Sequence, residues 1–284
     1  MSNLKIATTS KEVRDTVREW KSQGLTVGLV PTMGYLHEGH GSLIKASANQ
    51  CDRTVVSVFL NPTQFAPNED LESYPRDFEQ DKVLSEKMGS DLVFHPEVSE
   101  MYEQDNATFV EILSEMPKQL CGKTRPIHFR GVCTVVSKLF NIVTPDKAFF
   151  GEKDAQQLAI IKRMVRDMSY GIEIVGCPII REEDGLAKSS RNTYLNEEER
   201  KAALCLSKAI FFGQSLVEKG ETDANKVLEE MKNLINKEPL ARIDYVEAVD
   251  GVTMMPVDKI EKDTLVAMAV YIGKTRLIDN FSVK

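Results

Sequence analysis

Two histidines, His37 and His40, follow a short apolar segment at residues 25–30 and precede a segment of helical character at about residues 40–50. The N-terminus of a helix attracts anions, because its first backbone N–H groups lack partners and the helix dipole is positive there. Imidazole can donate to phosphate oxygens, and Gly39 lets a flat ring approach the backbone closely. The pattern favours phosphate binding, although a solvated loop or a pair of metal ligands would use the same residues.

Two side-chain amides, Asn61 and Gln64, lie on a loop that Pro62 stiffens, just after a predicted strand. Amides can address carboxylate, hydroxyl and amide groups of a ligand, although loop amides commonly cap their own backbone. Lys153 also follows a predicted strand and opens a helix. It would face a bound anion there, or form an exposed ion pair on a capped helix.

A serine-rich segment at residues 188–192 holds two hydroxyls and a guanidinium that could clamp phosphates, or serve as a flexible hinge. Histidine is scarce in the chain, and three of its four histidines lie in or beside polar loops. The fourth, His95, has no second polar motif beside it and is interpreted as structural. Arg125 and His128 lie on a loop that could contact a carboxylate, or could simply lead into a helix.

The elements that must position these side chains alternate along the first part of the chain. Helical patterns lie at about residues 10–23, 40–50, 78–88, 132–142 and 154–168. Strand-like segments lie at residues 25–30, 54–60, 91–94, 108–112, 147–150 and 172–175. This alternation predicts an α/β fold with a parallel sheet wrapped by helices, in which ligands bind beyond the carboxyl ends of the strands.

The texture changes after about residue 181. Two helical segments, 196–219 and 223–237, are followed by strand-like segments near 243–249, 264–271 and 275–280. We therefore expect two domains: residues 1–181, and a smaller C-terminal α+β domain at residues 182–284. The polar, glycine-containing join at residues 181–185 is typical of a hinge.

Composition narrows the class of protein. Of 284 residues, 42% are hydrophobic and 28% are charged, which is ordinary for a folded enzyme. No apolar run is long enough to span a membrane, and the charged start does not resemble a signal peptide. The net charge of −7 and the absence of a basic cluster argue against nucleic acid as a partner. The five cysteines form no close pair, so we expect reduced thiols and a cytoplasmic protein.

Six motifs, taken in order, resemble the pantothenate synthetase family across nearly the whole chain. They are PTMGYLHEGH, FLNPTQF, RPIHFRGV, GEKDAQQLAI, KSSRNTYL and TRLIDN. The HEGH element alone is similar to a wider superfamily of adenylate-forming and nucleotidyl-transferring enzymes. The resemblance implies a Rossmann-like sheet flanked by helices and a smaller C-terminal lid domain.

The resemblance also implies a reaction. Pantoate attacks the α-phosphorus of Mg-ATP and releases pyrophosphate, and β-alanine then attacks the pantoyl adenylate and releases AMP. The product, pantothenate, is a precursor of coenzyme A. The expected cofactors are ATP, as a substrate, and Mg²⁺, with ligands unknown, and the expected assembly is a homodimer. The transition state gathers negative charge on phosphate oxygens, which agrees with motifs rich in cations and donors rather than nucleophiles.

The resemblance assigns roles position by position. The catalytic candidates are His40 as proton donor, together with His37, Lys153 and Arg191. The ATP contacts are Met33, Gly34, Tyr35, Leu36, His37, Glu38, Gly39, His40, Gly151, Glu152, Lys153, Asp154, Ile180, Lys188, Ser189, Ser190 and Arg191. Gln64 and Gln157 match positions that hold pantoate, and Gln64 also lies where β-alanine enters. Asp81 matches a position suspected to face Mg²⁺, and a surface carboxylate is its other interpretation.

Two positions depart from the family pattern: Ile127 replaces a common glycine, and Lys188 replaces an apolar residue. These two departures concern the local loop shape and the phosphate contacts. A nucleotidyltransferase of the same superfamily is the second enzyme hypothesis, but it would not need two substrate-facing glutamines. A nucleotide-sensing or scaffold protein could have lost Lys153 or the histidines. A transfer-RNA synthetase fragment is disfavoured by the acidic balance.

Overall fold

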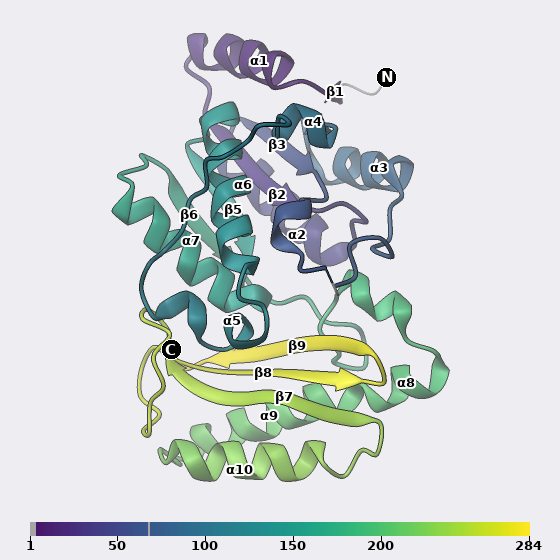
Figure 1. Ribbon diagram of the computed structural model, residues 1–284, viewed down its shortest axis with the longest axis vertical. Coiled ribbons are helices and arrows are strands. Elements are labelled where there is room, and N and C mark those ends of the chain that lie inside the picture. The colour runs from purple at the N-terminus through teal and green to yellow at the C-terminus, as the bar shows by residue number, and fades with distance from the viewer. Residues whose placement is uncertain (1–3, 68) are drawn as a thin grey trace. The chain divides into compact units, whose positions relative to one another are not determined.

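The computed structural model describes residues 4–67 and 69–284, which form two compact units (Figure 1). Unit 1 consists of the described residues up to Leu113, together with residues 125–152 and 160–178. Unit 2 consists of residues 114–124, 153–159 and 179–284. Two short segments that precede residue 160 therefore belong to the C-terminal unit.

Unit 1 is built on a parallel sheet, in which the described residues supply six strands. These are β1 (Lys5–Ala7), β2 (Val27–Thr32), β3 (Arg53–Val58), β4 (Leu92–Phe94), β5 (Lys147–Gly151) and β6 (Glu173–Cys177). Their spatial order is β1-β4-β3-β2-β5-β6, and every neighbouring pair runs parallel. The order reverses between β2 and β5, so the loops after these two strands flank the switch point where such sheets bind ligands.

Helices cover both faces of this sheet. They are α1 (Ser10–Ser22), α2 (Glu38–Gln50), α3 (Phe78–Met88), α4 (Val98–Met101), α6 (His128–Val143) and α7 (Ala155–Asp167, from residue 160 on). Leu29 and Val30 are adjacent on β2 and point to opposite faces, yet both are completely buried. On the face of Val30, Leu43 and Ile44 of α2 complete the core. Strands buried on both faces explain the unbroken apolar runs in the sequence.

Unit 2 contains an antiparallel sheet in the order β7 (Ala241–Asp250), β8 (Thr264–Ile272), β9 (Thr275–Ser282). Its helices are α5 (Cys121–Thr124), α8 (Glu197–Ala202), α9 (Leu204–Glu218) and α10 (Ala224–Ile235). One apolar core joins α9 and α10 to the sheet, and it includes Ile210, Met231 and Met268. Its architecture is the α+β arrangement that the sequence predicts, but the unit also includes residues 114–124 and 153–159, which the sequence places in the first domain.

The predicted α/β architecture is confirmed, but the structure differs from the sequence prediction at several places. Residues 108–112 form no strand. The helix predicted at 196–219 is observed as α8 and α9, which Ala203 separates with helical dihedral angles of φ −58° and ψ −21°. Short β1 was missed. The first helix is capped by Thr9, through a capping box with Glu12.

Candidate active site

The predicted nucleotide loop leads from β2 into α2 within unit 1. His37 is the N-cap of α2, and its Nδ1 accepts a hydrogen bond from the Gly39 N–H at 3.1 Å. The His37 N–H in turn donates to Nδ1 of His40 at 3.2 Å, and the two ring centroids lie 4.1 Å apart. The histidines thus form a capping box in place of the usual Ser and Glu.

The hydrogen bonds of this cap determine which ring nitrogen of each histidine can donate a hydrogen bond. A nitrogen that accepts a hydrogen bond carries no proton, so the neutral rings of His37 and His40 carry theirs on Nε2. Each Nε2–H is then a donor held beside the positive end of α2. The arrangement suits hydrogen bonding to an anion at this helix N-terminus.

The backbone before the cap is held by a buried carboxylate. Gly34 and Tyr35 have positive φ angles of 84° and 51°. Asp81 of α3 accepts the N–H of Tyr35 at 3.0 Å and that of Leu36 at 2.6 Å. The side chain is only 1% exposed, so its interpretation as a surface carboxylate is wrong. No local sequence signal could have shown this contact, since it joins residues 45 apart.

Gln64 ends the short 3-10 helix η1 (Pro62–Gln64) and is buried. Asn61, which caps η1, donates to the Gln64 Oε1 at 3.0 Å, and Tyr102 donates to the Asn61 Oδ1 at 2.9 Å. The Gln64 Nε2 lies 3.1 Å from the sulfur of Met33, on the nucleotide loop. The structure therefore brings a predicted pantoate ligand together with a predicted ATP-loop residue.

Helix α6 fixes the backbone of Gln64 from the other side. His128 Nδ1 lies 3.0 Å from the Gln64 carbonyl oxygen. An ideal Cβ on Gly131 would lie 2.5 Å from the Thr63 carbonyl oxygen and 2.6 Å from the Gln64 N and Cα. Only glycine allows this approach. Ile127, which departs from the family pattern, is the residue before α6, and its φ of −92° requires no glycine.

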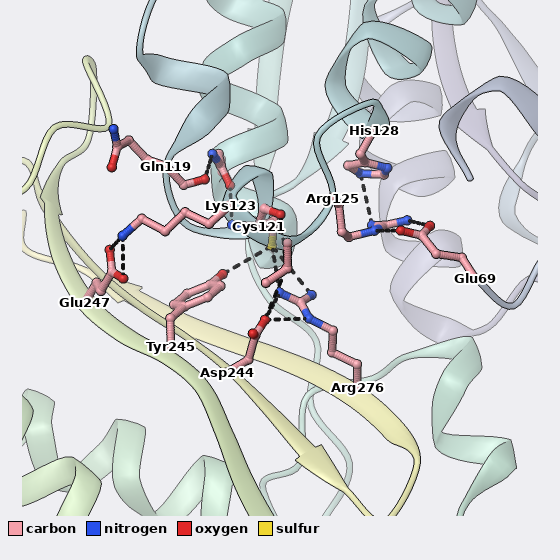
Figure 2. Close-up of polar contacts among 12 residues, drawn as sticks. Glu69, Gln119, Cys121, Lys123, Arg125, His128, Asp244, Tyr245, Glu247 and Arg276 are labelled. Carbon is pink, nitrogen blue, oxygen red and sulfur yellow. Dashed lines mark hydrogen bonds and ion pairs between the residues drawn. The ribbon is translucent and has the colours of Figure 1, made fainter. Parts of the chain in front are cut away.

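Arg125 contacts a carboxylate of the protein itself (Figure 2). Its Nε and Nη2 donate to the two oxygens of Glu69 at 2.8 and 2.5 Å, and its Nη1 lies 3.2 Å from His128 Nε2. Burial alone would raise the Glu69 pKa, but the hydrogen bond and charge of Arg125 outweigh it and hold the pKa below its usual value. The pair ties the loop after Gln64 to the start of α6.

The remaining predicted ATP contacts in unit 1 lie at the C-terminal end of strand β5. The register pairs Gly28 with Lys147, and Thr32 and Gly151 each lie four residues beyond that pair, so β2 and β5 end level. Gly151 is the last residue of β5, and Glu152 begins the 3-10 helix η3 (Glu152–Asp154). Both lie at the switch point of the sheet.

Unit 2 holds the other candidates after β5. Lys153 is mostly buried, with its Nζ 3.5 Å from Asp154, and its carbonyl oxygen accepts a 2.8 Å hydrogen bond from Asn280 of β9. Asn280 belongs to the closing TRLIDN motif, which explains how that distant segment contributes. Gln157 lies half-buried on the first turn of α7.

The last group is a hairpin followed by a 3-10 helix, η4 (Ser190–Tyr194). The Lys188 N–H donates to the Ile180 carbonyl at 2.9 Å, so these two predicted ATP contacts are neighbours. Lys188 pairs with Glu182 at 3.0 Å, so the departure from an apolar residue adds an ion pair. Ser189 caps η4 by accepting the Arg191 N–H, and Ser190 is buried.

The sequence did not single out Gln156, whose side chain holds the segment that precedes Arg125. Its Nε2 donates to the carbonyls of Met116 and Gln119, and its Oε1 accepts the Cys121 N–H at 3.0 Å. Gln156 is buried and the adjacent Gln157 is half-buried. The sequence shows only two successive glutamines, which does not reveal which of them faces inward.

A buried cluster fixes the same segment to the C-terminal sheet (Figure 2). The Tyr245 hydroxyl lies 3.2 Å from the Cys121 sulfur, and Arg276 lies 3.6 Å from that sulfur while pairing with Asp244 at 2.8 Å. Burial raises the Tyr245 pKa well above its usual value. Lys123 adds two bonds of 2.7 and 2.8 Å to Glu247.

Among residues 4–67 and 69–284, no group of three or more His, Cys, Asp or Glu side chains is placed to hold a metal ion. Within the same residues, no helix has the length and apolar character needed to cross a bilayer.

Comparison with known proteins gives consistent matches over the full chain. Residues 5–282 match the family model described as pantoate-beta-alanine ligase. The chain is 61% identical over 279 residues to the pantothenate synthetase of Ruminiclostridium cellulolyticum, covering 98% of this chain and 99% of the relative. It is 59% identical over 274 residues to the pantothenate synthetase of Enterococcus faecalis, with coverage of 96% and 97%.

Solved structures of the same family also match this chain. The pantothenate synthetase of Thermus thermophilus matches with a TM-score of 0.93 and 41% identity, over 98% of this chain and 99% of that one. The pantoate-beta-alanine ligase of Francisella tularensis, solved in complex with beta-gamma ATP and beta-alanine, matches with a TM-score of 0.80 and 33% identity. That match covers 98% of this chain and 97% of the other.

A parallel sheet with polar loops at the carboxyl ends of its strands, and a helix capped by two histidines, characterise an α/β protein whose helix terminus is suited to an anion. The matches to known proteins identify the family within this class. The chain belongs to the pantoate-beta-alanine ligase family, and it is a ligase that joins pantoate to β-alanine through an amide bond. The family predicted from the six motifs is confirmed, and the nucleotidyltransferase and scaffold hypotheses are set aside.

Proposed function

We propose that this ligase activates pantoate as an enzyme-bound pantoyl adenylate and transfers the pantoyl group to β-alanine, with release of AMP and pyrophosphate. The observation that carries the proposal is the double-histidine cap of α2, with both Nδ1 atoms accepting N–H bonds. It holds two Nε2–H donors at a helix N-terminus, which suits a phosphate group. A complex of the related Francisella tularensis ligase contains beta-gamma ATP and beta-alanine, which supports ATP as the activating substrate.

In the first step, a carboxylate oxygen of pantoate bonds to the α-phosphorus, the bond from that phosphorus to the bridging oxygen breaks, and pyrophosphate leaves. Charge builds on the phosphate oxygens in the transition state, so fixed donors and cations lower the barrier. We assign His37 and His40 to the phosphates, with His40 as proton donor. Lys153 and Arg191 neutralise charge, and the hydroxyls of Ser189 and Ser190 donate to phosphate oxygens.

Loop backbone completes the nucleotide contacts. Residues 33–40, 151–154 and Ile180 are assigned to ATP, together with residues 188–191. Family membership supports this assignment, as does the position of residues 33–40 and 151–152 at the switch point of the sheet.

Gln64 and Gln157 are assigned to pantoate, and Gln64 also to β-alanine. The Gln64 amide donates to a methionine sulfur, which is a weak acceptor, so a pantoate oxygen can replace that partner at little cost. In the second step, the β-alanine amine attacks the acyl carbon of the adenylate and AMP leaves, because adenylate is a far better leaving group than hydroxide.

We assign Mg²⁺ to the substrate as Mg-ATP. This ion commonly uses one or two carboxylates together with substrate phosphates rather than a cage of protein ligands.

We also propose a division of roles, an assembly and a compartment. Residues 1–181 bind nucleotide and pantoate, and residues 182–284 form the lid domain. The protein acts as a homodimer in the cytoplasm, without nucleic acid or membrane partners. Five free cysteines fit a reducing compartment, and light scattering of the purified protein tests the dimer.

Isotope exchange between ATP and labelled pyrophosphate tests the adenylate step. Exchange should require pantoate and proceed without β-alanine, whereas AMP should accumulate only when both are present. Formation of ADP and phosphate in place of AMP and pyrophosphate would contradict the proposal. A nucleotidyltransferase would instead need a phosphorylated acceptor in place of pantoate for the exchange.

A further inference from the structure

Asp81 joins helix α3 to the loop that carries the two histidines. Each of its carboxylate oxygens accepts a separate backbone N–H: Oδ2 accepts from Tyr35 at 3.0 Å, and Oδ1 accepts from Leu36 at 2.6 Å. The preceding residue, Gln80, places its Nε2 3.5 Å from the Leu36 carbonyl oxygen. The first turn of α3 therefore contacts both the donor and the acceptor of one peptide residue, directly before the His37 cap.

The backbone at this point is one that the sequence alone would not hold. Tyr35 has a φ of 51°, in the left-handed region that residues with a Cβ rarely adopt. An ideal Cβ on Gly34 would lie 3.1 Å from the Asp81 Oδ2, so the carboxylate also fills the space beside the turn. Strained backbone persists only where its surroundings over-determine it, and two short N–H bonds supply that constraint.

The charges that face Asp81 come from its own helix and from the neighbouring strand end. Burial raises its pKa, and the N–H bonds from Leu36 and Tyr35 lower it. Asp77 at the start of α3 raises it further, and His95 lowers it. His95 is stacked on Phe78 and bonded to the Val58 carbonyl, which supports its structural role.

We infer that Asp81 is a positioning residue for the nucleotide loop, acting through the backbone of Tyr35 and Leu36 to hold His37 and His40 in line with the phosphates. The inference rests on the proposed function. Leu36 also inserts its buried side chain into the core, so the loop stays attached when the carboxylate is changed. Loss of Asp81 should therefore loosen the approach to the cap and leave the fold intact.

The test compares Asp81→Asn with Asp77→Asn. Asparagine has the shape of aspartate, but it offers one acceptor and turns an NH₂ group toward the second N–H, which leaves that donor unsatisfied. Asp77 is an exposed N-cap of the same helix, and asparagine caps helices as well as aspartate does. The two variants thus carry the same chemical change, but only the Asp81 variant alters a side chain that contacts the nucleotide loop.

We expect Asp81→Asn to weaken binding of a non-hydrolysable ATP analogue about tenfold by calorimetry, and to raise the KM for ATP while the KM for β-alanine stays within about twofold. Asp77→Asn should match the wild type in both. Unchanged analogue binding by folded Asp81→Asn would overturn the inference, and so would a rise in the KM for β-alanine equal to the rise in the KM for ATP. If Asp81→Asn does not fold, Gln80→Ala serves as the test variant. The Gln80 side chain is exposed, so its removal should not disturb the fold. Its removal should raise the KM for ATP severalfold.

The experiments distinguish failure of the Asp81 inference from failure of the adenylate mechanism. Analogue binding needs no chemistry, so it tests Asp81 even if the adenylate mechanism is wrong. Absence of pantoate-dependent pyrophosphate exchange in the wild type would reject the mechanism and leave the binding result standing.

Discussion

Replacing Gly131 with alanine should misplace Gln64 without unfolding the protein. The new Cβ would lie 2.5 Å from the Thr63 carbonyl oxygen and 2.6 Å from the Gln64 N and Cα. Non-bonded contacts of carbon are most favourable at about 3.5–4.0 Å, so η1 must move by on the order of 1 Å. A misplacement of about 1 Å can cost about 100-fold in rate.

The stability change should be small, because two effects oppose each other. Alanine is favoured over glycine inside a helix by about 1 kcal/mol, and the new contact costs about 1–3 kcal/mol. The net loss of about 2 kcal/mol or less corresponds to a fall in Tm of a few degrees. The assay is steady-state AMP release at varied pantoate, with Tm measured on the same sample.

We expect kcat/KM for pantoate to fall about 100-fold in Gly131→Ala. The matched control is Gly213→Ala in α9, where the new Cβ would lie 2.5 Å from the Met231 Sδ and 2.9 Å from its Cγ, and so meets a side chain rather than backbone. That control should keep its kcat/KM for pantoate. A folded Gly131→Ala protein with wild-type kcat/KM would refute the view that the position of Gln64 governs pantoate use.

Three further results are expected. His40→Ala and Lys153→Ala should each slow pantoate-dependent pyrophosphate exchange by about 100-fold or more, and near-normal exchange would remove their assigned roles. The folded-state pKa of Glu69 lies below its usual value near 4.5, so its ion pair stabilises the fold above about pH 4.5 and loses this effect as pH falls through the folded pKa. The difference in urea midpoint between wild type and Glu69→Gln should thus be constant from about pH 8 to 5 and shrink below, and a pH-independent difference would count against the pair. Burial raises the pKa of Cys133 and of Cys205 to about 12, so iodoacetamide at about pH 8 should modify these thiols only after unfolding, as mass spectrometry can show.

Local sequence patterns predicted most elements of the fold. Helix α3 was predicted at its observed bounds, because Gly89 ends it in a left-handed C-cap. Apolar runs located the central strands, whose burial on both faces leaves no alternating pattern. The segment at 108–112 was taken for a strand, but among the described residues no strand pairs with it.

Contacts between distant segments could not be predicted from single motifs. Asp81 has the sequence surroundings of an exposed helical carboxylate, and only the fold brings it against the loop 45 residues earlier. Gly131 resembles any helical glycine until η1 is packed against it. The sequence left Arg125 either as a contact to a carboxylate or as part of a loop leading into a helix, because it does not show that Glu69 pairs with Arg125.

The central claim is that pantoate is activated through its own carboxylate oxygen. Pantoate labelled with ¹⁸O in the carboxylate should transfer one label to AMP, because that oxygen bonds to the α-phosphorus and stays with AMP when the amide forms. Mass spectrometry of AMP measures this directly. Label found in AMP agrees with the adenylate mechanism, and unlabelled AMP with the label retained elsewhere would contradict it.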